Sequence, residues 1–206
     1  VFRDELTNLF PDDARARRLH DNSMMLSEFL VNRAENYQPP KFEHKALVHG
    51  HCHHKAIMHL DAEQALMQKM GLDYEILDSG CCGMSGSFGF EREKYDVSIA
   101  AGERVLLPKV READEDTLII TDGFSCREQI AETTQRRALH IAEVLRMAMD
   151  RSQATLAEGP PERDIVERRA RAQRQANRRA ATVAGAVVAG GLLLWGANRR
   201  RQQSRR

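Results

Sequence analysis

Two patterns of hydrophobic and polar positions alternate along the first 150 residues, one typical of buried strands and one typical of amphipathic helices. Short apolar runs predict strands over residues 45–49, 73–77 and 117–121. Each run is followed by a segment whose apolar residues recur three and four positions apart, as they do on one face of a helix. The alternation predicts an α/β fold with a parallel sheet built from βαβ units.

The helical pattern also gives approximate bounds. Helices are expected over residues 12–36, 54–70 and 133–150, and others are expected to begin near Glu91 and at Arg127. Gly71 is placed to end the second of these helices. The first helix is expected to pack on the body through its apolar residues Leu19, Met24, Met25, Leu26, Phe29 and Leu30. The helix after Glu91 carries Tyr95, Val97, Ile99, Val105 and Leu106.

The pattern changes after residue 150. Residues 151–179 form an Arg-rich segment that predicts a linker or a solvated helix, residues 180–197 are an uncharged run, and residues 198–206 are basic. A helix of 18 residues spans about 27 Å, close to the thickness of a bilayer core. We therefore predict a helical tail in which residues 180–197 cross a membrane and anchor a cytoplasmic body. A lipid-surface or disordered basic tail is the alternative.

Charge divides the chain in the same place. The net charge of +1 conceals a tail with 13 Arg and 4 acidic residues. Residues 1–150 carry 18 basic and 26 acidic side chains. Such asymmetry predicts a folded body with a separate tail. Nucleic-acid binding is disfavoured, because the basic residues come with no aromatic platform and no recognised motif.

Four cysteines accompany the predicted strands. With no secretory signal at the N-terminus, they suggest thiolates in a reducing compartment and not a disulfide framework. Cys81 and Cys82 are adjacent, which strains a disulfide between them. Cys52 lies 28 intervening residues upstream of the pair, and Cys126 lies 43 downstream. Because each cysteine site follows the end of a predicted strand, all four are expected at the same edge of the sheet, where such folds bind ligands.

Four thiolates suit a zinc ion or an iron–sulfur cluster. Close C-x-x-C pairs, typical of structural zinc sites, are absent from the sequence, which favours a cofactor seated in a preformed cleft. Gly80, Gly83 and Gly86 would let the backbone approach such a group, and the loop lacks the ending of a phosphate-binding P-loop. Several histidines surround Cys52, and among them His51 and His53 are candidates to bind the cofactor.

The motifs VFRDELTNLFPDD, HGHCHHKA, SGCCGMSGSFGFE and TDGFSCREQI together resemble the cysteine-rich CCG domain. This domain occurs in glycolate oxidase iron–sulfur subunits, in one of the subunits of heterodisulfide reductase, and in the C-terminal part of FAD-linked D-2-hydroxyacid dehydrogenases, to which the likeness is strongest. The resemblance covers residues 1–149. It implies a 4Fe-4S cluster on the family's cysteine positions, which here are Cys52, Cys81, Cys82 and Cys126.

The resemblance also implies a role in electron transfer. The cluster would pass electrons from an FAD flavin that has oxidised a 2-hydroxy acid, of the D-lactate, glycolate or D-2-hydroxyglutarate type, to an acceptor such as a quinone or a carrier protein. The flavin would lie on an upstream domain or a partner subunit, since the chain begins at Val1 without methionine and is expected to be a fragment. No residue is a convincing catalytic acid, base or nucleophile, so the chain would be part of an enzyme without its substrate-oxidising site.

One position departs from the family. Where some members continue to C-x-x-C, this chain has Gln129 three residues after Cys126, which puts a cluster with a fifth sulfur ligand in doubt. Two other functions stay open. One is a zinc-binding structural or interaction module anchored to a membrane, and the other is thiol–disulfide chemistry at a cluster, as in heterodisulfide reductase.

Overall fold

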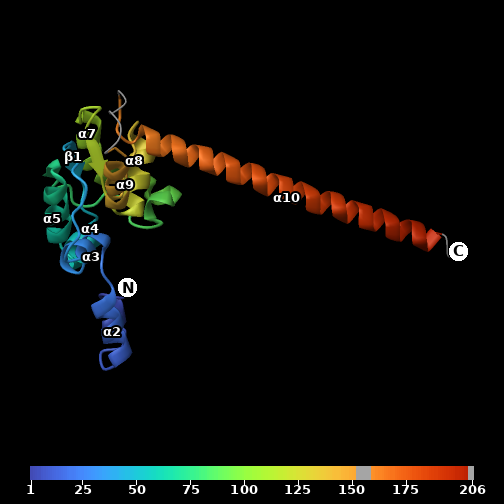
Figure 1. Ribbon diagram of the computed structural model, residues 1–206, viewed down its shortest axis with the longest axis horizontal. Helices are drawn as coiled ribbons and strands as arrows, with labels where there is room; N and C mark the ends of the chain where they lie inside the picture. Colours follow the sequence, from blue (N-terminus) through green and yellow to red (C-terminus); the bar gives the residue numbers. More distant parts are fainter. Residues whose placement is uncertain (152–158, 204–206) are drawn as a thin grey trace. The chain divides into compact units, whose positions relative to one another are not determined.

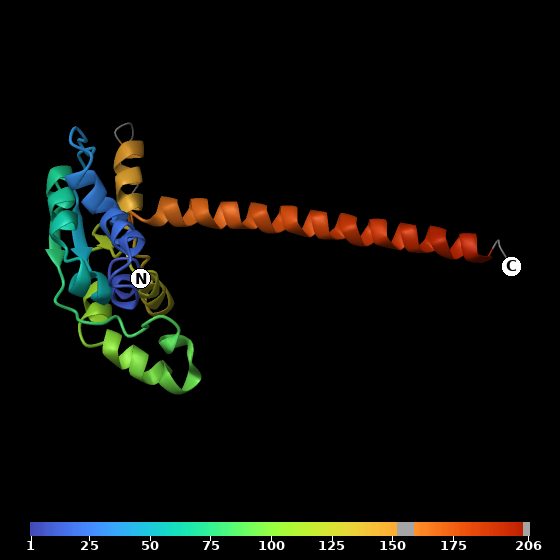
Figure 2. The ribbon, with the colours of Figure 1, turned by 90° about the horizontal axis from the view of Figure 1, so that it is seen from below.

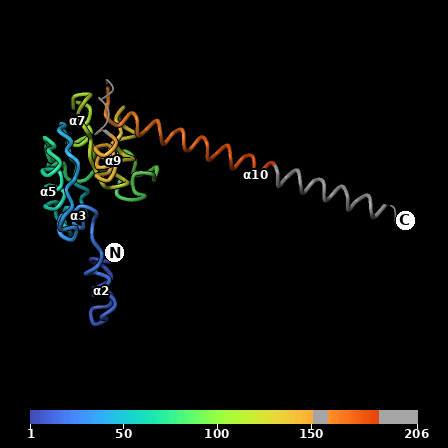
Figure 3. The backbone as a smooth tube through the Cα atoms, viewed as in Figure 1, coloured from blue at the N-terminus to red at the C-terminus, as the bar shows by residue number. Residues whose placement is uncertain are grey.

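The computed structural model describes residues 1–151 and 159–203, and within them the side chains of residues 1–150 and 159–185. Figure 3 traces the backbone. The chain divides into two units, Val1–Glu162 and Arg163–Arg206. The helices of the first unit, with two short 3-10 turns, are α1 (Glu5–Leu9), α2 (Ala14–Asn22), α3 (Leu26–Asn32), α4 (Cys52–Ile57), α5 (Asp61–Met70), η1 (Phe88–Phe90), η2 (Arg92–Lys94), α6 (Tyr95–Gly102), α7 (Leu106–Glu112), α8 (Phe124–Thr133) and α9 (Ile141–Arg151).

A small parallel sheet forms the centre of the first unit (Figure 1). Its strands are β1 (Lys45–Val48), β2 (Asp73–Ile76) and β3 (Leu118–Ile120), in the order β2-β1-β3. All pairings are parallel, and Ala46 of β1 lies opposite Tyr74 on one side and Leu118 on the other. The mixed α/β class and the parallel sheet predicted from the sequence are confirmed.

Alternation along the strands gives the sheet two buried faces. Leu47 and Ile119 pack in one apolar cluster with Leu107 of α7 and Ile130 of α8. Val48 and Ile120 point the other way, toward a group of side chains that includes Met67 of α5 and Ile141 of α9. The strands thus lie between α7 and α8 on one face and α5 and α9 on the other.

The two longest helices predicted for the N-terminal half are each two helices, so those predictions were wrong in extent. The first divides into α2 and α3 at residues 23–25, where the Ser23 hydroxyl donates to the Leu19 carbonyl and competes with the helical backbone bonds. The second divides into α4 and α5 at residues 58–60, where His59 has a left-handed φ of 62°. Gly71 does end α5, with a φ of 83°.

The helix predicted over residues 133–150 was wrong at its start. Leu139 is extended and pairs with Ile120 next to β3, and α9 begins only at Ile141, whose backbone N–H donates to the Asp122 carboxylate. The helix expected after Glu91 is also divided, into α6 and α7. Tyr95 and Val97 of α6 are more than half exposed. In Figure 2 the two 3-10 turns and α6 form the green segment at the lower end of the body.

The second unit holds one helix, α10 (Arg163–Gln203). The side chains of residues 171–185 are exposed, and residues 152–158 of the predicted linker lie outside the described part of the chain. Among the residues that the structure describes, no helix combines the length and apolar character needed to cross a bilayer. The side chains of residues 186–197 are not among those described, so the anchor predicted over residues 180–197 stays a prediction.

Candidate metal centre

The three strands end at the same edge of the sheet, and a cysteine site follows each end. Cys52 is the first residue of α4, four residues beyond β1. Cys81 and Cys82 lie in the loop that follows β2, and Cys126 lies in the first turn of α8, shortly after β3. Since neighbouring strands are parallel, segments far apart in the sequence meet at this edge.

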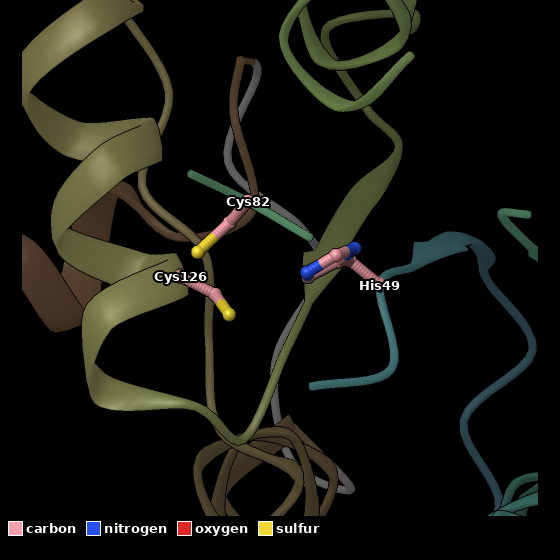
Figure 4. A group of neighbouring side chains, drawn as sticks. All are labelled: His49, Cys82 and Cys126. Atoms are coloured by element: carbon pink, nitrogen blue, oxygen red, sulfur yellow. The ribbon is translucent and has the colours of Figure 1, made fainter. Parts of the chain in front are cut away.

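A compact group of three side chains forms the inner part of the site. The ligand atoms of His49, Cys82 and Cys126 all lie within 4.8 Å of one another, and all three residues are buried. Figure 4 shows the two thiols side by side with the His49 ring facing them. The Nδ1 atom of His49 is 2.6 Å from the Ser79 hydroxyl, and Nε2 has no hydrogen-bond partner. A buried Nε2 without a partner is available to a metal or to a sulfur atom.

The two inner thiols, Cys82 and Cys126, have pKa values shifted in opposite directions. The Cys126 thiol is the main cause that lowers the pKa of Cys82, to about 4, against the opposing effect of burial. His49 and the backbone N–H groups of Met84 and Ser85 lower it further. The same contact with Cys82, together with burial, raises the pKa of Cys126. Cys82 is therefore a thiolate near neutral pH, which is the form that binds metal.

Cys52 and Cys81 form an outer pair. Cys81 is half-buried, and its sulfur accepts a hydrogen bond of 3.3 Å from the Gly83 backbone N–H. Burial raises its pKa, the Gly83 N–H opposes this, and the neighbouring thiols of Cys82 and Cys52 raise it further. Cys52 is exposed. All four cysteines are free, so the site offers two buried sulfurs and two nearer to solvent.

The glycines of the cysteine loop differ in what they allow. Gly83 has a φ of 95°, and a Cβ there would lie 1.9 Å from the Ser98 carbonyl oxygen of α6. A Cβ on Gly102 would lie 2.8 Å from the Cys82 carbonyl oxygen. The loop therefore rests directly on the α6 backbone. Gly80 and Gly86 also have positive φ angles, but both are exposed and a Cβ would meet nothing within 4 Å, so they serve the turn alone.

The two histidines predicted to bind a cofactor lie in different settings. His51 precedes α4, where its Nδ1 is 3.5 Å from the backbone nitrogen of His54, and burial lowers its pKa. A Cβ on Gly123 would meet both the His51 ring at 2.6 Å and the Cys126 sulfur at 2.9 Å, so His51 borders the inner thiols. His53 is exposed and neighbours acidic side chains of the N-terminal segment. Sequence reasoning included His49 only among several histidines, although its place at the end of a buried strand was the signal for it.

Gln129 lies three residues after Cys126, where the resemblance to the CCG domain predicts a fifth cysteine in some members. It is buried, and its Nε2 atom donates to both the backbone oxygen and the hydroxyl of Ser98 at 3.2 Å each. Ser98 is the residue against which Gly83 packs. Gln129 therefore ties α8 to α6, beneath the loop that carries Cys81 and Cys82.

These features together define a class of site. Four free thiols and one imidazole meet at the strand ends of an α/β domain, and a thiolate-rich set of this kind suits soft metal centres such as zinc or an iron–sulfur cluster. The buried Nε2 atom of His49, which has no hydrogen-bond partner and lies beside two buried thiols, fits such a centre.

Comparison with curated proteins connects the chain to dehydrogenases. It is 35% identical over 106 residues to a subunit of the anaerobic glycerol-3-phosphate dehydrogenase of Escherichia coli K12, a match that covers 51% of this chain and 26% of that protein. It is 31% identical over 98 residues to the D-2-hydroxyglutarate dehydrogenase of Pseudomonas putida, covering 47% of this chain and 9% of that protein. A D-2-hydroxyglutarate dehydrogenase of Pantoea ananatis is 31% identical over 67 residues, covering 32% of this chain and 6% of that protein.

The chain thus spans about a quarter or less of the length of these relatives. No protein-family model and no solved structure matches it. The similarity to these dehydrogenase chains covers about half of this chain or less, and the assignment to the CCG domain stays a prediction.

Proposed function

We propose that this chain is an electron-transfer module of a dehydrogenase and that it holds an iron–sulfur cluster, most simply 4Fe-4S, through Cys52, Cys81, Cys82 and Cys126. The observation that carries the proposal is that four free cysteines from three separate strand ends lie together in a chain similar to dehydrogenases. Such a site holds as many thiolates as a cubane cluster has irons.

Each part of the chain has a task in this proposal. The cluster, when bound, supplies one-electron chemistry. Cys82 and Cys126 anchor its buried side, and the Gly83 N–H, which already donates to Cys81, would stabilise negative charge on sulfur. His49 lies within reach of the inner thiols, with Nε2 free to donate a further hydrogen bond in its protonated form. Because Cys52 is exposed, the cluster would approach the surface on that side, which shortens the path to an electron donor or acceptor.

The donor and the acceptor belong to the same proposal. We propose an FAD flavin, on another domain or a partner subunit, that oxidises a 2-hydroxy acid and passes its electrons through this chain to a quinone or a carrier protein. The name of the Pseudomonas putida relative supports D-2-hydroxyglutarate as the type of acid. Glycerol 3-phosphate is a second candidate substrate, because it is named for the Escherichia coli relative, which has the higher identity.

Anaerobic purification followed by absorbance, iron and acid-labile sulfide assays tests the proposal. We expect a brown protein with about four irons and four sulfides per chain. Cys82→Ser is expected to lose most of the iron, while Ser87→Ala, an exposed change in the same loop, is expected to keep it. A colourless protein without iron after cluster reconstitution would refute the proposal. Zinc without sulfide would favour the structural module, and turnover of a disulfide substrate by the holoprotein would favour thiol–disulfide chemistry.

A further inference from the structure

A second group of metal-ligating side chains lies at the same edge of the sheet, outside the cysteine site. It consists of His54 in α4, Glu63 in α5 and Asp122 just after β3, whose candidate ligand atoms all lie within 4.8 Å of one another. Ile120, Thr121 and Asp122 at the end of β3 all line the cavity beside this group, and Thr121 also borders Cys126.

The group is buried but incompletely hydrogen-bonded. His54 is 5% exposed and Glu63 is 7% exposed, and the two side chains form an ion pair in which His54 Nε2 lies 3.2 Å from Glu63 Oε1. The second carboxylate oxygen of Glu63, Oε2, is buried and has no hydrogen-bond partner. A buried polar atom left without a partner costs about 1–3 kcal/mol, so Oε2 is an oxygen that a further ligand could satisfy.

One oxygen of each carboxylate accepts a hydrogen bond from a neighbouring residue. The Ser27 hydroxyl donates to Oε1 of Glu63, and the Ile141 backbone N–H donates to Oδ1 of Asp122 at 2.9 Å. His140 approaches Oδ1 of Asp122 at 3.7 Å. Contacts of this kind orient a ligating carboxylate without using all its lone pairs, as do the hydrogen-bonded neighbours of known metal ligands.

A small cavity lies among these side chains. Its volume is about 20 Å³, and its lining includes His54, Glu63 and Asp122. That is room for a single water molecule or ion and for nothing larger.

We propose that His54, Glu63 and Asp122 bind one divalent metal ion of the zinc type, at a site separate from the four cysteines. One imidazole and two carboxylates are three ligands of the kind that zinc takes. His54 and Glu63 already lie side by side, and Oε2 of Glu63 is the carboxylate oxygen left to bind an ion.

The charge of the three side chains also favours a divalent metal ion. Two carboxylates and a neutral imidazole carry a formal charge of −2, which a dication balances. A protonated His54 is the competing arrangement, since the Glu63 carboxylate raises its pKa. That arrangement neutralises only one of the two carboxylates and leaves Glu63 Oε2 without a partner.

A metal ion bound at this site would also change the properties of the cysteine centre. His49 lines the same cavity and belongs to the inner thiol group, so it separates the proposed ion from the sulfurs by one side chain. A positive charge at that range stabilises a reduced centre more than an oxidised one, so filling the site raises the reduction potential of the centre. This consequence rests on the proposed electron-transfer function, whereas the binding of the ion does not.

Zinc binding to the full chain, prepared with the cysteine site loaded, tests the proposal. After treatment with a chelator, the protein is titrated with Zn²⁺ in competition with a chromophoric chelator, and the zinc ligands are identified by X-ray absorption. We expect one equivalent of tightly bound zinc with nitrogen and oxygen neighbours at about 2.0–2.1 Å and no sulfur shell at about 2.3 Å. Glu63→Gln is expected to weaken binding at least about tenfold, as far smaller changes around zinc sites do. Glu75→Gln, an exposed change in β2, is expected to leave it unaltered.

The atoms bound to zinc, identified by X-ray absorption, distinguish this site from the cysteine site and so keep the test independent of the proposed cluster. If the thiols take zinc instead of iron and sulfide, the wild-type chain is expected to bind a second equivalent with sulfur ligands, and the nitrogen and oxygen site is still counted. Absence of a zinc ion with only nitrogen and oxygen ligands in the wild-type chain would overturn the proposal, whether or not the variants fold. Equal affinity in wild type and a folded Glu63→Gln would also overturn it.

Discussion

Replacement of Gly83 by alanine tests whether the cysteine loop depends on its contact with α6. The residue follows Cys82 directly, and its φ of 95° is one that a side chain disfavours. The new Cβ would lie 1.9 Å from the Ser98 carbonyl oxygen, and the carbonyl carbon would be 2.8 Å away. Both atoms belong to the helix backbone, so no flexible side chain can move aside.

The size of the conflict decides the expected outcome. Ordinary van der Waals contact with a Cβ begins at 3.4 Å, so the loop or the helix must move by about 1.5 Å. Metal–ligand distances vary by only about 0.2 Å between sites. The movement of the loop is therefore several times larger than a metal site allows. For the free energy of unfolding, the left-handed backbone costs about 1–2 kcal/mol. Overpacking against α6 adds about 1–3 kcal/mol.

Gly86→Ala is the matched control, because Gly86 lies in the same loop with a φ of 65°, and a Cβ at this position would have no atom within 4 Å. It carries the backbone cost without the collision. We expect Gly86→Ala to lose about 1–2 kcal/mol in urea unfolding and to keep its iron after reconstitution. Gly83→Ala is expected to lose a further 1–3 kcal/mol, roughly, and to retain little iron. If Gly83→Ala matches Gly86→Ala in both iron content and stability, the reasoning is wrong.

Three further predictions concern the stability of the first unit and of its metal site. Gln129→Ala removes both hydrogen bonds to Ser98, so we expect a loss of about 1–3 kcal/mol in urea unfolding and faster loss of iron to a chelator; unchanged values in both assays would contradict this. Glu162→Ala leaves the buried Arg136 guanidinium without its carboxylate, 2.8 Å away, and is expected to cost about 3–5 kcal/mol in thermal unfolding, whereas a loss below about 1 kcal/mol would show the pair to be dispensable. Removal of the metal group from the cysteine site is expected to lower the melting temperature of the wild-type chain but not that of Cys82→Ser, because a ligand stabilises only a state that binds it. Equal shifts in the two proteins would indicate that the group binds outside the cysteine site.

The strands and their order of appearance could be predicted because their signal is local. A run such as Leu118–Ile120 is buried on both faces, and its apolar pattern does not depend on distant contacts. The helix bounds could not be predicted in the same way. The apolar spacing continues through His59, yet this residue takes a left-handed conformation that the rest of the fold imposes. Leu139 likewise fits a helical pattern, but pairing with Ile120 draws it into an extended segment.

For the candidate site, the positions of the cysteines in the sequence were enough to place them at one edge of the sheet. They did not show which of the cysteines are buried. Cys82 and Cys126 are buried in an apolar cluster with side chains of α7 and α8, and no local pattern places these helices against them, whereas Cys52 is exposed. The second metal group was missed for a related reason. Its members come from two helices and from the residues after a strand, so no single stretch of the sequence shows them together. Parallel strand ends thus bring together side chains that lie far apart in the sequence, in this group as well as at the cysteines.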